Sequence, residues 1–294
     1  MGGSASYRLG KKIANARLNG ASQDELDELE RQRQAALNAE RQKRQEAKQP
    51  KEKSFRDKLN DVKTGDELSK LLNEKYSTVA SGVVANNDID MVKRAIRTLD
   101  ELEEQYPFMK GKISGLEYQY VPNVPAAMHA KFNGENGTVN QNFKFGAGWE
   151  IKDNPKFYSG SERGFTPPNQ TPESIVAHEF GHAIANIVTS RKLAQARAKG
   201  KIDALFYIDD IKKGKELEYL EKRALDLLGI KQAAKARKEI SGYAKEARMY
   251  EGIPTRESFA EAFADVYSNG DKASNVSKAY VKVLLEEVKN LTGG

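Results

Sequence analysis

The feature that most constrains this chain is a short run in which two histidines stand four positions apart, His178-Glu179-Phe180-Gly181-His182. On an α-helix, residues i and i+4 share one face, so His178 and His182 can present two imidazoles to a single metal ion. Zn²⁺ accepts neutral imidazole nitrogen, and a catalytic zinc keeps one position open for water. Glu179 is expected beside that water as the general base. The run therefore predicts a helix that carries two zinc ligands and a base.

The surroundings of this run favour a buried helix over a chance match. The chain has only three histidines, and two of them fall in the run. Thr171-Pro172-Glu173 has the features of a helix start: an N-cap residue, a proline in the first turn and an acid near the positive helix end. Apolar residues flank the motif on both sides. The third histidine, His129, is expected in a strand and not as a ligand.

A second acidic pattern stands near the C-terminal end, in Glu257-Ser-Phe-Ala-Glu261-Ala-Phe-Ala-Asp265. Its acids recur at i, i+4 and i+8, between small and aromatic residues, which predicts a carboxylate delivered to a metal. Glu257 is the predicted third zinc ligand, and Glu261 is expected to accept a hydrogen bond from a ligating histidine. Asp265 is expected to be structural. The alternatives are an ordinary amphipathic helix with exposed acids here, and a third ligand from the acidic run at 216–221.

Together these two motifs resemble the gluzincin zinc metallopeptidase domain of the anthrax lethal factor type. The segment from Thr171 to His182 is also similar to metallopeptidase-like domains in phage minor head or capsid proteins. The resemblance covers roughly residues 110–290 and is specific at the two motifs, although Ser258 replaces an aromatic residue that is usual in the family. It implies a zinc-dependent endopeptidase that acts on a polypeptide substrate.

The resemblance also implies a tyrosine that stabilises the tetrahedral intermediate. In the family this tyrosine lies seven residues before the third ligand, which selects Tyr250. Tyr243 is the alternative, because Ile240-Ser-Gly-Tyr243-Ala244 resembles the sequence that usually surrounds this tyrosine in the family.

The expected fold class is α+β, a mostly helical, zincin-like domain with a small antiparallel sheet. Three short strands are predicted at 116–121, 126–132 and 138–145, separated by proline and by turn residues. We expect the last of these strands to form a sheet edge beside the metal. Thr138, Val139 and Asn140 are then the residues expected to bind an extended substrate.

The chain is expected to divide into a charged helical N-terminal arm and linker (1–60), a helical cover (61–110) and the metallopeptidase domain (111–294). Residues 1–58 hold 14 Lys/Arg against 9 Asp/Glu, so the basic charge belongs to the arm. No aromatic residues alternate with the basic ones there, so nucleic-acid binding is not expected. The arm is predicted to be a solvated helix or to bind other virion proteins. The alternative function is therefore that of a structural minor head protein of a phage virion, which retains a zincin-like domain.

The composition limits the kinds of metal site and the cellular locations that are expected. The absence of cysteine excludes disulfides and thiolate metal sites. No classical signal peptide and no membrane-spanning stretch are visible, so a cytoplasmic or virion-associated location without membrane contact is expected.

Overall fold

The computed structural model describes residues 4–48, 53–120, 126–132, 138–146, 166–169, 171–198, 214–247 and 253–292. The chain forms two compact units, Met1–Ser54 and Phe55–Gly294. The first helix of the larger unit, α3 (Phe55–Asp61), lies in the range that was expected to belong to the arm. The expected helical cover and the expected metallopeptidase domain both belong to the larger unit.

The smaller unit is a pair of helices, α1 (Ala5–Leu18) and α2 (Gln23–Lys48), which pack against each other. Ser4 begins α1 by accepting a hydrogen bond from the Tyr7 amide. The backbone N–H and the hydroxyl of Ser6 donate to Glu40 of α2. Among the side chains that the structure describes in this unit, Ile13 and Leu29 are the buried apolar ones. The two helices are therefore held together by a small apolar contact and by hydrogen bonds.

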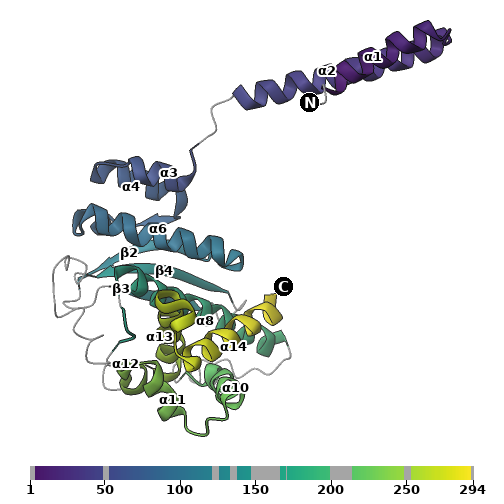
Figure 1. The fold of residues 1–294 in the computed structure, drawn as a ribbon. Helices are drawn as coiled ribbons and strands as arrows, with labels where there is room; N and C mark the ends of the chain where they lie inside the picture. Colours follow the sequence, from purple (N-terminus) through teal and green to yellow (C-terminus); the bar gives the residue numbers. More distant parts are fainter. Residues whose placement is uncertain are drawn as a thin grey trace. The chain divides into compact units, whose positions relative to one another are not determined.

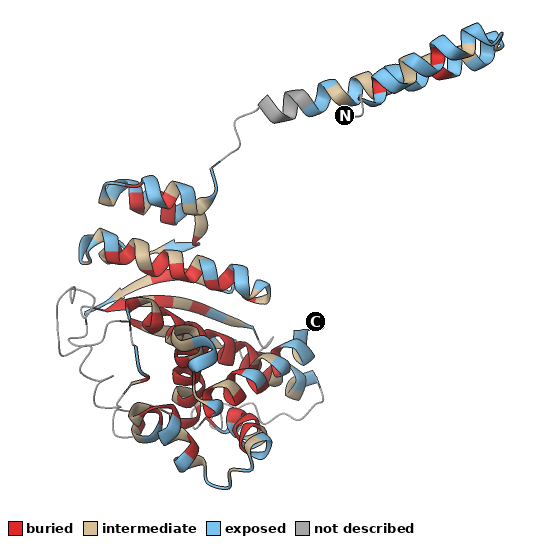
Figure 2. Ribbon diagram, viewed as in Figure 1, coloured by how far each residue is buried: buried red, intermediate tan, exposed pale blue. Residues whose placement is uncertain are grey.

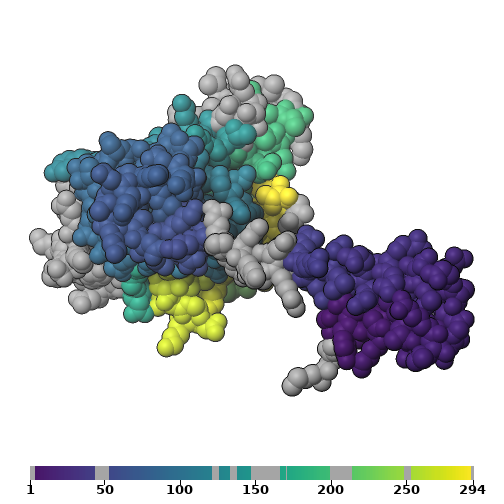
Figure 3. All heavy atoms as spheres, turned by 90° about the horizontal axis from the view of Figure 1, so that it is seen from above, coloured from purple at the N-terminus to yellow at the C-terminus, as the bar shows by residue number. Residues whose placement is uncertain are grey.

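The first part of the larger unit is helical, as expected. It contains α3, α4 (Gly65–Lys75), α5 (Gly82–Ala85), α6 (Ile89–Gln105) and the 3₁₀ turn η1 (Pro107–Met109). Thr64 and Glu67 form a capping box at the start of α4, and Asp88 caps α6. The apolar positions of α6 recur every three or four residues and are buried (Figure 2). Seen from above in Figure 3, the blue atoms of this segment form a continuous face of the larger unit.

The sheet has four strands in the order β1-β2-β4-β3: β1 (Thr78–Val79), β2 (Ile113–Gln119), β3 (Ala126–Phe132) and β4 (Val139–Gly146). β1 pairs with β2 and β2 with β4 in parallel, whereas β3 and β4 are antiparallel. The sheet is therefore mixed, and the prediction of an antiparallel sheet is wrong. The physical reason is that β4 turns back from β3 and inserts between β3 and β2, where it runs in the same direction as β2.

The predicted sheet edge is also wrong. β4 is an inner strand, in which Val139 pairs with Phe132 and Asn140 with Lys131 of β3. The Ser114 hydroxyl on the β2 side donates to the side chain of Asn140. Thr138, Val139 and Asn140 therefore do not lie on a free edge. The edge strand on this side of the sheet is β3.

The remaining elements are α8 (Pro172–Ala198), η3 (Lys215–Leu217), α10 (Glu218–Leu228), α11 (Ala233–Ile240), α12 (Gly242–Glu246), α13 (Pro254–Asn269), η5 (Gly270–Lys272) and α14 (Asn275–Thr292). α8 packs on α13, α6, β3 and β4, and α14 packs on α13, α10 and α8 (Figure 1). The larger unit is mostly helical around a small sheet, which confirms the α+β class. Within the described residues, no helix has both the length and the apolar character needed to cross a membrane.

Candidate metal centre

The helix that carries both histidines is α8, which begins where the sequence predicted. The Ser174 amide donates to Thr171 Oγ1 at 3.2 Å, and the Thr171 amide donates to Ser174 Oγ at 2.8 Å, so the two residues cap the helix reciprocally. Glu173 in the first turn accepts a bidentate pair of hydrogen bonds from Arg94 of α6, at 2.7 and 3.0 Å. These contacts fix the start of α8 against α6.

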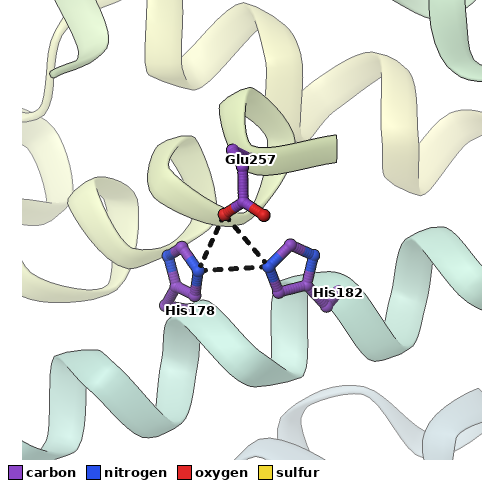
Figure 4. A group of neighbouring side chains, drawn as sticks. All are labelled: His178, His182 and Glu257. Carbon is purple, nitrogen blue, oxygen red and sulfur yellow. Dashed lines mark hydrogen bonds and ion pairs between the residues drawn. The ribbon is translucent and has the colours of Figure 1, made fainter. Parts of the chain in front are cut away.

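Three side chains converge one turn further along α8 (Figure 4). The Nε2 atoms of His178 and His182 lie 3.1 Å apart. Glu257 Oε2 from α13 lies 3.4 Å from His178 Nε2 and 3.3 Å from His182 Nε2. Among the residues that the structure describes, these form the group of histidine and acidic side chains that could hold a metal ion.

The two helices come close because both carry small residues at their crossing. Gly181 of α8, between the two histidines, faces Ala260 of α13. On one side of the crossing, the rings of Phe180 and Phe263 pack against Tyr106, with centroids 5.5 to 6.0 Å apart. The alternation of small and aromatic residues in the acidic motif therefore reflects close packing on α8.

Glu261 lies next to the ligand group, one turn after Glu257. Its Oε1 is 2.8 Å from His178 Nδ1, so it accepts a hydrogen bond from that nitrogen and leaves Nε2 facing the group. Burial lowers the pKa of His178, but its hydrogen bonds to Glu257 and Glu261 outweigh this and raise the pKa well above its usual value. Burial raises the pKa of Glu257, but the neighbouring His182 and His178 outweigh it and lower the pKa.

Glu179, the predicted general base, is 6% exposed and lies beside the ligand group. Burial raises its pKa, against the opposing effect of the two neighbouring histidines. Its carboxylate also accepts a hydrogen bond from the backbone N–H of Met128 on β3. The edge strand of the sheet therefore contacts the predicted base directly.

The structure brings Tyr243 to this group. Its ring centroid lies 6.4 Å from that of His178, and it stands on α12, which Ser241 caps by accepting from the Ala244 amide. Burial raises the pKa of Tyr243, and the charges of Glu257, Glu261 and Glu179 raise it further. Tyr250 lies outside the described residues, so its assignment stays a prediction.

Other candidates from the sequence lie elsewhere. His129 is half exposed on β3 and pairs with Glu117 at 3.3 Å. Glu216 and Glu221 of the acidic run pair with Arg256 and Arg237 and contribute no ligand. Asp265 accepts hydrogen bonds from the Asn269 side chain and the Ser274 amide, which is a structural role.

Two buried polar residues near the ligand group were not predicted from the sequence. Asn186, one turn after His182, donates to the side chain of Gln141 on β4 at 3.0 Å. The signal for Asn186 was its place on the same helical face as the histidines. Gln141 gave no signal, because a glutamine in a strand is ordinarily exposed.

No protein-family model, curated protein or solved structure matches this chain in the comparisons made.

Proposed function

We propose that this chain is a zinc-dependent endopeptidase of the gluzincin type with a zincin-like domain. The observation that carries the proposal is the convergence of His178, His182 and Glu257 on one point with the buried Glu179 beside them. Two imidazoles and one carboxylate are a ligand set of catalytic zinc sites.

The distances fit zinc. For zinc bonds of about 2.0–2.1 Å in a tetrahedron, neighbouring ligand atoms lie about 3.3–3.4 Å apart. The three ligand atoms here are 3.1, 3.3 and 3.4 Å apart. These spacings would allow His178, His182 and Glu257 to hold zinc together, and a catalytic zinc would keep a further position for water or substrate.

When bound, zinc would polarise the substrate carbonyl and lower the pKa of water toward about 7. Glu179 accepts the proton of the attacking water and then passes it to the leaving amine. Its raised pKa suits a group that must both take up and release a proton. Tyr243 keeps its proton because its pKa is raised, so it donates a hydrogen bond to the oxygen of the tetrahedral intermediate.

The polypeptide substrate is proposed to bind along β3. This strand forms the end of the sheet beside α8, and its Met128 contacts Glu179. An extended peptide that adds to a sheet edge gains backbone hydrogen bonds there. Addition to β3 would bring the scissile bond beside the base and the ligand group.

The test compares the wild type with Glu179→Gln, and uses Glu218→Gln, an exposed acid on α10, as the control. Zinc content and hydrolysis of a mixed peptide library are measured for all three. We expect about one zinc ion per chain in each, and hydrolysis by the wild type and the control alone. Hydrolysis by Glu179→Gln would remove the base from the proposal, and a wild type that takes up no zinc would overturn the proposal as a whole.

A role as a structural assembly protein, such as a minor head protein of a phage virion, is the second candidate. It is favoured by the separate N-terminal unit, whose two helices are highly charged. Such a role does not use Glu179. Chemical cross-linking to partner proteins would then be the same in the wild type and in Glu179→Gln.

A further inference from the structure

A buried carboxylate outside the ligand group contacts both of the helices that supply the ligands. Oε1 of Glu216, in η3, accepts a hydrogen bond from Thr189 Oγ1 of α8 at 3.1 Å. The same oxygen accepts from Arg256 Nε of α13 at 3.1 Å and also from Arg256 Nη2. The side chain of Glu216 is 1% exposed. One oxygen atom therefore joins α8 to α13.

The two contacted residues are close in sequence to the ligands. Thr189 lies two helical turns after His182, and residues seven apart share a helical face. Arg256 immediately precedes Glu257. A shift of either residue relative to Glu216 would therefore shift a ligand relative to the others.

Arg256 is unfavourably placed for helix stability alone. It stands in the first turn of α13, where the helix dipole is positive and disfavours a cation. The N-cap residue, Ile253, provides no side-chain hydrogen bond to this helix end. A buried ion pair is also costly to desolvate, so its presence is weak evidence for a contribution to stability. The arginine at this position is explained by its bond to Glu216.

We infer that Glu216 is a positioning residue of the metal centre, which holds the helix of Glu257 in register with the helix of the two histidines. The inference rests on the proposed zinc site. Glu216 contacts no ligand atom, and it acts through Thr189 and Arg256.

The experiment measures zinc dissociation constants of the full-length chain by competition with a chromophoric chelator. The variant is Glu216→Gln, which keeps the shape of the side chain and removes its charge. The control is Glu287→Gln. Glu287 of α14 also links α8 to another helix, through Lys192 at 2.9 Å and Arg223 of α10 at 3.1 Å, but neither of these partners belongs to α13.

We expect Glu216→Gln to raise the dissociation constant about tenfold or more, the usual effect of losing a residue that supports metal ligands. Glu287→Gln should leave the constant unchanged. The unfolding temperature of the zinc-free proteins is measured in parallel, so that a loss of stability alone is recognised. Wild-type affinity in Glu216→Gln, or an equal loss in both variants, would overturn the inference.

A second variant covers the case in which Glu216→Gln does not fold. Thr189→Val removes only the hydrogen bond from α8 and leaves the pair with Arg256. It should weaken zinc binding in the same direction and change the visible spectrum of the cobalt-substituted protein, because the ligand geometry changes. Unaltered affinity and spectrum would overturn the inference. A wild type without zinc affinity would instead refute the proposed function.

Discussion

Gly181 and Ala260 are in such close contact that a Cβ atom on Gly181 would lie 3.0 Å from the Cα of Ala260, and equally close to the Cβ of Phe263. Gly181 separates the two histidines, and Ala260 lies three residues after Glu257. The absence of a side chain at Gly181 therefore sets how closely Glu257 can approach His178 and His182.

Gly181→Ala is expected to weaken zinc binding more than it weakens the fold. The added methyl group must push α13 away by a few tenths of an ångström, whereas the better helix propensity of alanine offsets about 1 kcal/mol of the strain. The measurements are the zinc dissociation constant and the unfolding temperature without zinc. Gly10→Ala, whose new Cβ would make ordinary contacts with Arg33, is the control. Unchanged zinc affinity in Gly181→Ala would show that the close approach of α8 and α13 at this residue is not required for zinc binding.

His182→Ala and Glu257→Ala are each expected to lose the bound zinc. Either change leaves two ligands, which do not hold zinc tightly, because structural and catalytic sites use at least three protein ligands. Zinc content after dialysis is the measurement, with Glu218→Ala as the control. Zinc retained at wild-type affinity in Glu257→Ala would mean that the third ligand is another residue.

Removal of zinc is expected to lower the unfolding temperature. A ligand at about 1,000 times its dissociation constant stabilises the folded state by about 4 kcal/mol, which corresponds to several degrees or more for a unit of this size. Calorimetry with and without a chelator measures the difference. Glu257→Ala should show no such difference, and a chelator effect of wild-type size in that variant would point to another zinc site.

Tyr243→Phe is expected to reduce kcat about 100-fold while zinc content and KM change little, since a donor to the tetrahedral intermediate acts only in the transition state. Tyr250→Phe is the matched variant. Kinetics of both on one peptide substrate measure the effect. A large loss of kcat in Tyr250→Phe, with wild-type kcat in Tyr243→Phe, would assign the donor role to Tyr250 instead.

The pair Arg94–Glu173 is expected to make stability depend on pH. Burial raises the pKa of Glu173, but hydrogen bonds and the charge of Arg94 outweigh it, so the pKa in the folded protein lies below the usual value of 4.5. A lowered carboxyl pKa stabilises the fold above the unfolded pKa, and this contribution is lost as the pH falls through the folded pKa. Thermal unfolding of zinc-free wild type and Glu173→Gln should therefore differ by a few degrees near neutral pH and less at acid pH. A constant difference across this range would contradict the role of the pair.

The sequence allowed the prediction of those parts of the site that depend on one helix. The spacing of His178 and His182 and the acids of α13 follow the helical repeat, so each half of the ligand group was visible locally. The position of Glu216 in the structure was not predictable, because its partners Thr189 and Arg256 lie 27 and 40 residues away. It was considered only as an alternative ligand.

Sheet topology was less predictable than the helices. The existence of β2, β3 and β4 was visible from their residues, but their order depends on a pairing between β2 and β4 that bypasses β3. The error arises because long-range packing, and not a local sequence pattern, decides which strands are neighbours.

The candidate ligands come from two helices, and this has a consequence for when the proposed metal centre can form. His178 and His182 are brought together by a single helical turn, but Glu257 arrives only after the segment between α8 and α13 has folded and the two helices have docked. Closing so long a loop costs conformational entropy, so we expect the two helices to dock late in folding. The proposed peptidase activity therefore requires the complete tertiary structure, and a partly folded chain would not cleave neighbouring unfolded chains or itself.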